Sequence, residues 1–576
     1  MDPHRGETPV GVHFSNLTSM KITGARFIAQ TLHAYGVTHV FYMDAILRKT
    51  LVEMETLGIR RIITHSEKAA AYMADGCARI SGRPGICMAQ SVGAANLAAG
   101  LQDAYLGVSP VIALTGKKLP HAQHRHAYQE IQHHPLYEPV TKYNVEVVNL
   151  EQLALQLRQA FREATTGAPG PVHLDLHGYN GRYMEDSEAD LEVIAEAGFS
   201  RYPAFRTEPD DASIRNAAAA IEAAERPVIV AGGGVRLSSA RAAVAALAEK
   251  LSVPVATSVN GKGTLPSGHR LSVGVVGSYS VECANRVVSE ADLVIYIGSN
   301  TGDQVTNGWT VPRPGTPIVQ IDIEPAEIGR SFPGAVGVVG DARAAVENLT
   351  AAVSGGPPQI AWLKRVDELV AAWRAETEPL LQSDDVPIRP ERLCAELTAV
   401  LPEDAVLVAD TGYSAIWTST LVELQHPGQT YLRAAGSLGW AFPAALGVKC
   451  AVPDRPVVCF TGDGGFWYHL SEMETAARFG INTVTVVNNN GGLAQGIPDI
   501  RRIYSGRDGR PEELFRFGAV NFARLAHEMG CLGIRVEAPD EIGDALREAL
   551  GAGVPAIVEV VTGLEYFAPA PWVPEK

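Results

Sequence analysis

Short apolar runs alternate with amphipathic stretches along almost all of this 576-residue chain. Runs of roughly four to eight residues rich in Val, Ile and Ala indicate strands buried on both faces, and the amphipathic stretches indicate helices that cover those faces. The alternation is typical of mainly parallel sheets with helices on both sides, the α/β class. Because a single hydrophobic core stops growing at about 250–300 residues, we expect several domains.

The expected strands fall into three blocks separated by poorly patterned sequence. The first block, 20–185, contains HVFYM, RRIITHS, GICMAQS, VSPVIALTG and GPVHLDL. The second, 205–352, contains PVIVA, VPVATS, DLVIYIGSN and PIVQIDIEP. The third, 386–566, contains AVLVAD, PVVCFTGDG, NTVTVVNNN, LGIRVEA and AIVEVVT. We predict three α/β domains, each a mainly parallel sheet flanked by helices, and the first and third look like two versions of one design.

Charge and cysteine usage limit the partners and the compartment. A formal net charge of -16 argues against nucleic acid or an anionic membrane as the main partner. The chain has no apolar run of about 18 residues and no apolar leader at its start. Its seven cysteines are scattered without a CxxC pair, which fits a reducing compartment better than a disulfide framework or a zinc site. We expect a cytoplasmic protein without nucleic-acid or membrane partners.

A carboxylate in a glycine turn follows the apolar run VVCFT. Asp463 is followed by Gly464 and Gly465, and Asn488 and Asn489 end the next apolar run, Asn489 lying 26 residues after Asp463. The carboxyl ends of adjacent parallel strands meet at the edge where α/β sheets bind ligands. Carboxylate and amide oxygens suit Mg2+, and glycines at a helix start let backbone N–H groups approach a diphosphate. A plain βαβ turn would explain the glycines but not the paired asparagines.

This stretch resembles the thiamine-diphosphate (ThDP) binding motif of the acetolactate synthase and pyruvate decarboxylase superfamily, and the resemblance extends over almost the whole chain. It implies an enzyme that binds ThDP through Mg2+. It also implies a set of site residues: Asp463, Asn489 and the backbone carbonyl of Gly491 for Mg2+, Gly412, Tyr413 and Ser414 for the diphosphate, and Leu438 as the bulky residue under the thiazolium ring.

Two catalytic candidates lie in the first block. Glu67, in THSEKAAAYMADG, matches the family's glutamate that hydrogen-bonds N1′ of the aminopyrimidine. A partly buried carboxyl with a raised pKa can share a proton with a ring nitrogen, whereas a lone glutamate at a helix start is usually only a favourable charge. Gln129, in AYQE, matches the substrate-side segment, at the position that faces the reacting carbon.

Five histidines surround that second candidate. Three interpretations of the stretch HAQHRHAYQEIQHH stay open: a solvated polar loop, a metal site, and a catalytic role for one histidine that moves protons near neutral pH. The five are His121, His124, His126, His133 and His134.

Several segments depart from acetolactate synthases. Their Gly-Pro-Gly-Gly turn is Tyr42–Ala45 here, and their Ser-Gly-Pro-Gly-Ala segment is Gln90–Ala94. Asn300 and Gln304 replace two arginines, one that approaches FAD and one that grips a 2-oxo acid carboxylate, and amides cannot supply that charge. The dinucleotide fingerprint GxGxxG is also absent. We therefore expect no tightly bound FAD, and these changes argue against a charged 2-oxo acid acceptor.

The predicted function is to make or cleave a C–C bond next to a carbonyl, by 2-oxo acid decarboxylation and carboligation. Two alternatives stay open: a ThDP-dependent lyase of a 2-hydroxyacyl-CoA or 1,2-diketone, and a non-catalytic ThDP-binding subunit. The substrate should be a small carbonyl compound. The resemblance further implies a homodimer or homotetramer in which Glu67 of one subunit meets Asp463 of another.

Overall fold

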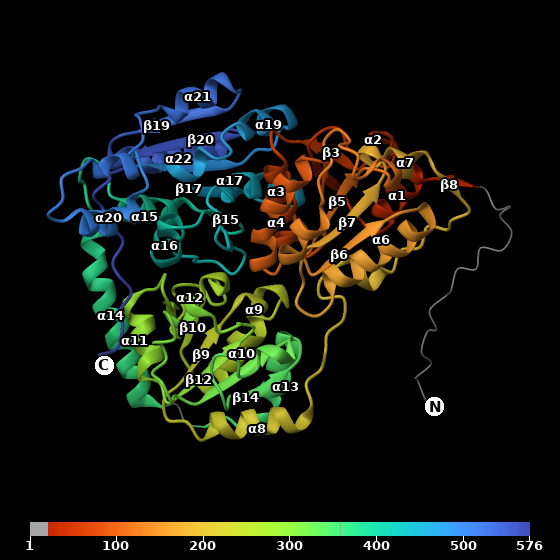
Figure 1. The fold of residues 1–576 in the computed structure, drawn as a ribbon. Coiled ribbons are helices and arrows are strands. Elements are labelled where there is room, and N and C mark those ends of the chain that lie inside the picture. Colours follow the sequence, from red (N-terminus) through yellow and green to blue (C-terminus); the bar gives the residue numbers. More distant parts are fainter. Residues whose placement is uncertain (1–20, 357–358, 576) are drawn as a thin grey trace.

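The computed structural model describes residues 21–356 and 359–575. Within them lie three six-stranded parallel sheets, each flanked by helices, so the predicted α/β class is confirmed. In Figure 1 the first sheet unit is red to orange, the central unit yellow to green, and the third unit teal to blue. Each sheet lies inside one of the three predicted domains, whose boundaries stay predictions. No helix in the described ranges is long and apolar enough to cross a membrane.

The first sheet has the order β3-β2-β4-β5-β7-β6. Its strands are β2 (His39–Tyr42), β3 (Arg60–Ile63), β4 (Gly85–Gln90), β5 (Val111–Lys117), β6 (Tyr143–Val147) and β7 (Val172–His177). The main helices are α1 (Gly24–Ala34), α2 (Arg48–Thr56), α3 (Glu67–Ser81), α4 (Gly93–Leu106), α5 (His134–Tyr137), α6 (Leu150–Thr165) and α7 (Arg182–Asp186).

The third sheet has the order β16-β15-β17-β18-β20-β19, the same succession as in the first. The predicted likeness of the two blocks is therefore confirmed at the level of topology. Its strands are β15 (Val406–Ala409), β16 (Thr430–Arg433), β17 (Val457–Gly462), β18 (Val484–Asn489), β19 (Leu532–Val536) and β20 (Ala556–Val561). The main helices are α15 (Pro390–Val400), α16 (Tyr413–Thr420), α17 (Ala441–Ala451), α18 (Asp463–Phe466), α19 (Glu472–Phe479), α20 (Ile497–Tyr504), α21 (Phe522–Glu528) and α22 (Ile542–Gly551).

The central sheet has the order β11-β10-β9-β12-β13-β14, the doubly wound arrangement whose strand order reverses at the first strand. Its strands are β9 (Pro227–Ala231), β10 (Val255–Thr257), β11 (Ser272–Val275), β12 (Leu293–Ile297), β13 (Ile318–Asp322) and β14 (Val336–Val339). The main helices are α8 (Asp211–Glu222), α9 (Gly233–Leu237), α10 (Arg241–Leu251), α11 (Glu282–Glu290) and α13 (Ala342–Ala352), and α14 (Ile360–Leu381) leads on to the third unit.

Four strands of the six-stranded sheets were not foreseen in the sequence: β6, β11, β14 and β16. All four lie at the edge of their sheet. An edge strand has a neighbour on one side only. The runs of β6 and β16 mix polar and apolar residues, and those of β11 and β14 are interrupted by glycine. The apolar-run criterion therefore finds every interior strand and the edge strands β3 and β19, but misses these four.

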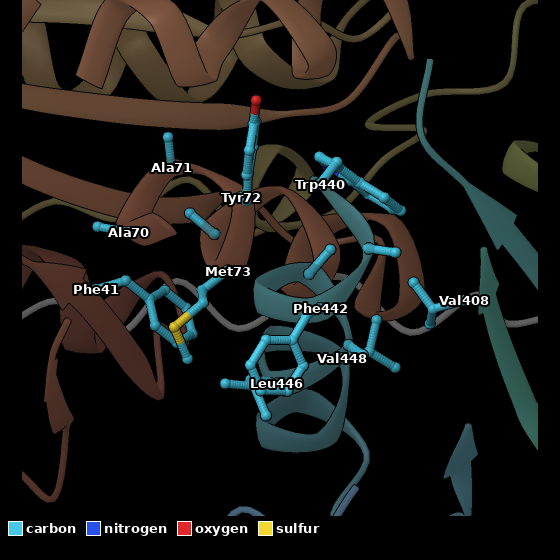
Figure 2. Close-up of a cluster of buried hydrophobic side chains, with 14 of the residues drawn as sticks. Phe41, Ala70, Ala71, Tyr72, Met73, Val408, Trp440, Phe442, Leu446 and Val448 are labelled. Atoms are coloured by element: carbon cyan, nitrogen blue, oxygen red, sulfur yellow. The ribbon is translucent and has the colours of Figure 1, made fainter. Parts of the chain in front are cut away.

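The first and third units of the chain pack directly on each other through α3 and α17. A Cβ on Gly76 of α3 would lie 2.1 Å from the Ala444 carbonyl oxygen, and one on Gly447 of α17 would lie 1.9 Å from the Met73 carbonyl oxygen. The two backbones therefore touch at glycines. Figure 2 shows Met73 beside the helix that carries Phe442 and Leu446, part of one apolar core shared by both units.

Candidate active site

The predicted cofactor residues of the third unit lie at the carboxyl ends of two neighbouring strands. β17 ends at Gly462, and α18 begins at Asp463. β18 ends at Asn489, and Gly462 pairs with Asn488 in the parallel register. The structure thus brings Asp463 and the asparagine run to one edge of the sheet, as the sequence pattern indicates.

Asp463 is a buried carboxyl without a basic partner. Its side chain is buried, and it forms no ion pair among the residues that the structure describes. Burial raises the pKa of Asp463 to about 7, and the backbone N–H groups of Gly464, Gly491 and Gly492 offset only part of that rise. A carboxyl in this position fits a bound cation, which would stabilise the ionised form that burial disfavours.

The asparagines after β18 are held by bonds within the chain. Asn489 Nδ2 donates to Glu559 Oε1 at 2.7 Å, and Asn489 Oδ1 accepts from the Gly491 N–H at 3.2 Å. Asn490 Oδ1 accepts from the Gly492 N–H at 3.1 Å. Both amide oxygens lie in the turn next to the backbone groups that face Asp463, so two amides qualify as ligands where the sequence singled out Asn489.

The two glycines after Asp463 are required by close neighbours. A Cβ on Gly464 would lie 2.6 Å from a methyl carbon of Leu493, and one on Gly465 would lie 2.5 Å from Asp410 Oδ2. Neither position can therefore carry a side chain without displacing these neighbours.

Asp410 is a site residue that the sequence reasoning missed. It is fully buried, and its carboxylate accepts from the Thr411 N–H at 2.8 Å, the Gly439 N–H at 3.1 Å and the Thr461 hydroxyl at 2.9 Å. Burial raises its pKa to about 6 despite these donors. One carboxylate thus ties together three segments that carry predicted cofactor residues. Its signal in the sequence is an aspartate directly after the apolar run AVLVA.

The diphosphate candidates begin α16. Gly412 adopts φ 64° and ψ -142°, a conformation that favours glycine, and Ser414 is buried, with its Oγ 3.6 Å from where a Cβ on Gly462 would lie. The ring of Tyr413 packs on Trp417, with centroids 5.7 Å apart, so Tyr413 would offer its backbone N–H rather than its side chain to a diphosphate.

Leu438 lies half-buried between two anchored backbone N–H groups. The Ser437 N–H donates to Asp103 Oδ2 at 3.0 Å, and the Gly439 N–H donates to Asp410. Asp103 belongs to α4 of the first unit and pairs with the buried Arg79 at 2.8 Å. The position of Leu438 therefore depends on both units.

Glu67 is the first residue of α3, as predicted, and Ser66 caps the helix by accepting from the Ala69 N–H at 3.1 Å. The Glu67 side chain is half-buried, and its Oε2 accepts from Asn96 Nδ2 at 3.2 Å. Its Oε1 lies 2.4 Å from where a Cβ on Gly93 would lie. The carboxylate is thus held against the start of α4, whereas the neighbours of Asp463 belong to the third unit.

Gln129 lies in a strained turn beside Ser91. Gln129 has φ 62° and Ser91 has φ 33°, and the Ser91 hydroxyl donates to the Gln129 carbonyl. The side-chain Oε1 of Gln129 is buried and has no hydrogen-bond partner among the described residues. An unpaired buried amide oxygen is costly, so it fits a polar partner that binds from outside the chain.

Of the five clustered histidines, four are exposed and one is buried. His133 is the buried one, 1% exposed; the exposed ones are His121, His124, His126 and His134. In the described part of the chain, no three His, Cys, Asp or Glu side chains are placed to hold a metal ion. The cluster is therefore not a metal site of that kind.

The substituted positions Asn300 and Gln304 line a pocket of about 690 Å³ that is formed mainly by the central unit and completed by residues of the first and third units. Arg433, which comes from β16 of the third unit, donates to Gln304 Oε1 and, at 3.1 Å, to Asn260 Oδ1. Arg236 follows the glycine turn after β9 and donates to the Arg79 carbonyl at 2.7 Å. Burial, together with the nearby Arg79, lowers the Arg236 pKa to about 9.

Three family models match successive parts of the chain. They are described as the N-terminal TPP binding domain, the central domain and the C-terminal TPP binding domain of thiamine pyrophosphate enzymes, and they match residues 22–136, 214–349 and 410–560. The probable acetolactate synthase large subunit of Methanocaldococcus jannaschii is 35% identical over 560 residues, 93% of this chain and 91% of the relative. The acetolactate synthase isozyme 1 large subunit of Escherichia coli is 32% identical over 481 residues, 83% of each chain.

The order of the three matches is the order of the three sheets. The third match includes Asp463, directly after β17, and the asparagines at the end of β18. The resemblance stated from the motifs is thus confirmed over nearly the full length. The chain belongs to the thiamine pyrophosphate enzyme family, among relatives that are acetolactate synthase large subunits, and is a ThDP-dependent enzyme of the C–C lyase and carboligase class.

Proposed function

We propose that the protein decarboxylates a 2-oxo acid and joins the remaining acyl unit to a second carbonyl compound, in a reaction that requires Mg2+. The names of the two relatives above support this reaction class. The observation that carries the proposal is Asp463, a buried carboxyl with a raised pKa and no basic partner within the described ranges, at the strand edge that holds the two glycines and the amide run.

Asp463, the Gly491 carbonyl and one amide oxygen would bind Mg2+. These are hard oxygen donors in the small number that Mg2+ accepts when it also bridges to phosphate oxygens. Gly464, Gly465 and the start of α16 would place backbone N–H groups against the diphosphate. Asn489→Ala and Asn490→Ala distinguish the two amides, because only loss of the true ligand should weaken Mg2+ binding.

When bound, ThDP supplies a nucleophilic carbon and an electron sink for the carbanion that C–C cleavage leaves. Glu67 would hold and move a proton at its Oε atoms, with Asn96 and Gly93 fixing the direction of the carboxylate. Leu438 would set the shape of the cofactor from its place between two anchored N–H groups. Gln129 would offer its unpaired amide oxygen to the substrate side.

A complete site would need two copies of the chain. Glu67 contacts α4 of the first unit, whereas Asp463 contacts the turn after β18 of the third unit. Within one chain these units also meet, at α3 and α17 and at His65, whose N–H donates to Glu472 Oε1 at 2.9 Å, but no hydrogen bond or ion pair among the described residues joins Glu67 to Asp463. We therefore propose a homodimer, or a homotetramer built from two dimers, with sites at the subunit interface.

The central pocket favours a second candidate, a lyase of a 2-hydroxyacyl-CoA. Arg236 is a guanidinium without an ion pair among the described residues, next to the glycine turn Gly232–Gly234. A guanidinium beside a glycine turn would suit the diphosphate of CoA. The same pocket carries Asn300 in place of the arginine that approaches FAD, so we propose that no FAD is tightly bound.

A substrate scan tests these assignments. Purified protein is incubated with pyruvate, with a 1,2-diketone or with a 2-hydroxyacyl-CoA, each with and without ThDP plus Mg2+, and the products are identified by mass spectrometry. The carboligase proposal predicts cofactor-dependent CO2 release and a longer hydroxyketone product from pyruvate. Cleavage of the CoA ester without activity on pyruvate would replace it with the lyase.

A further inference from the structure

Strand β7 of the first sheet carries an unusual polar face. Val172, Leu174 and Leu176 point into the apolar core on one side, as the strand alternation requires. The other side carries His173, Asp175 and His177, all buried. Strands inside a parallel sheet are normally apolar on both faces, so three buried polar side chains here call for a function.

Asp175 connects this face to the histidine-rich loop. His133 Nδ1 lies 2.9 Å from Asp175 Oδ1, and His133 Nε2 lies 2.9 Å from the Ser91 carbonyl oxygen. The Thr115 hydroxyl also reaches Asp175 Oδ1, at 2.8 Å, and lies 2.6 Å from His173 Nε2. His133 and Asp175 are 1% and 0% exposed, so water does not compete for these bonds.

The acceptors around His133 determine its protonation. A carbonyl oxygen can only accept, so Nε2 carries a proton toward Ser91. Burial would raise the pKa of Asp175, but the hydrogen bonds from His133 and Thr115 outweigh that effect and hold the pKa below its usual value. Asp175 is therefore ionised at neutral pH, and Nδ1 must carry a proton toward it as well. His133 is then an imidazolium paired with a carboxylate.

The surrounding groups place the positive charge on His133. His173 is stacked on Tyr137, and burial lowers its pKa to about 3, so it is neutral. On the same face, Lys117 Nζ lies 2.6 Å from Glu146 Oε1, and His177 Nε2 lies 3.3 Å from Glu146 Oε2.

We propose that His133, held doubly protonated by Asp175, is the positioning residue of the substrate-side turn. Its Nε2–H fixes the Ser91 carbonyl, and the Ser91 hydroxyl fixes the carbonyl of Gln129. Both turn residues have positive φ, a conformation that persists only where surrounding contacts enforce it. The substrate-facing role of Gln129 rests on the proposed function, but the positioning itself does not.

Two substitutions separate the two bonds of His133. An asparagine amide at this position reaches about as far as Nδ1 and keeps the bond to Asp175, whereas a glutamine amide reaches about as far as Nε2 and keeps the bond to Ser91. His133→Asn should therefore release the turn and His133→Gln should preserve it. The exposed His121 supplies the matched control, His121→Gln.

The first measurement is the nitrogen NMR spectrum of wild-type protein labelled at its 16 histidines. Because both ring nitrogens of His133 face acceptors, we expect one histidine whose two ring nitrogens both carry protons, and its signal should vanish in both His133 variants. A bare ring nitrogen on His133 at neutral pH would overturn the imidazolium assignment. Because this readout uses no substrate, it is independent of the proposed reaction.

The second measurement is hydrogen exchange of peptides that cover residues 118–137, followed by mass spectrometry. Loss of a hydrogen bond to a charged donor is worth roughly 1.5 kcal/mol or more, so exchange in His133→Asn should rise at least about tenfold. Exchange in His133→Gln and His121→Gln should stay within about threefold of wild type. Equal exchange in the Asn and Gln variants would show that the bond to Ser91 does not hold the turn.

Discussion

Replacing Gly93 by alanine should displace the Glu67 carboxylate without disturbing the fold. The added Cβ would lie 2.4 Å from Glu67 Oε1 and 3.0 Å from Cδ, and contacts below 3.0 Å are essentially never found. The carboxylate must therefore move by at least about 0.6 Å. Gly93 lies at the start of α4 without a positive φ, so alanine is tolerated by the backbone and favoured in a helix by up to about 1 kcal/mol.

A misplacement of about 1 Å at a reacting group can cost on the order of 10²-fold in rate. We expect turnover and hydrogen–deuterium exchange at thiazolium C2 to fall by that order in Gly93→Ala, with ThDP occupancy and melting temperature close to wild type. Gly268→Ala is the control, because a Cβ there meets nothing within 4 Å. Exchange at the wild-type rate, with cofactor bound, would refute the link between Gly93 and Glu67.

Three further predictions follow from the site and the central pocket. Glu67→Gln should retain ThDP and Mg2+ yet lose about 10²–10⁴-fold in turnover, measured with cofactor occupancy checked, because an amide cannot exchange the proton; unchanged C2 exchange would place the base elsewhere. Asp463→Ala should abolish thermal stabilisation by ThDP plus Mg2+ in differential scanning fluorimetry, and persistent stabilisation would remove the metal assignment. Burial, with Glu327 and Glu324, raises the pKa of Asp322 to about 6. The pKa of Asp322 is higher in the folded than in the unfolded state, so protonated Asp322 favours folding below about pH 4. As pH rises through about 6 the free energy of unfolding falls, by on the order of 3 kcal/mol. Asp322→Asn should therefore melt higher than wild type at neutral pH, with the gain shrinking toward about pH 5; a gain independent of pH would contradict this origin.

The sequence was sufficient for the three sheets and for the meeting of Asp463 and the asparagine run at one sheet edge, because apolar runs and a glycine turn with a carboxylate are local signals. Local patterns also placed Glu67 and Asp463 at helix starts, and each is the first residue of its helix, α3 and α18. Four of the edge strands were missed because polar residues or glycine interrupt their apolar runs. β16 is one of them, and it carries Arg433 into the central pocket.

Residues that act through distant partners could not be found by local signals. Asp410 binds Gly439 and Thr461, which lie 29 and 51 residues away, and nothing in its own segment announces either contact. His133 was one of five histidines with three open interpretations, and only its burial and its bond to Asp175, 42 residues away, separate it from the exposed four. The alternation HLDLH in a strand expected to be buried was the available signal, because polar residues there require partners.

The departures from acetolactate synthases and the buried histidine network occur in the same region of the first unit. Ser91, in the segment that lacks the family's proline and one of its glycines, is the residue that His133 holds and that in turn holds Gln129. A proline-containing turn restricts its own backbone, whereas Ser91 reaches a positive φ and needs an external bond to stay there. His133 supplies that bond from Nε2, while its Nδ1 faces the buried Asp175. The changed turn and the His133–Asp175 pair are therefore parts of one arrangement, which on the proposed function shapes the substrate side of the site.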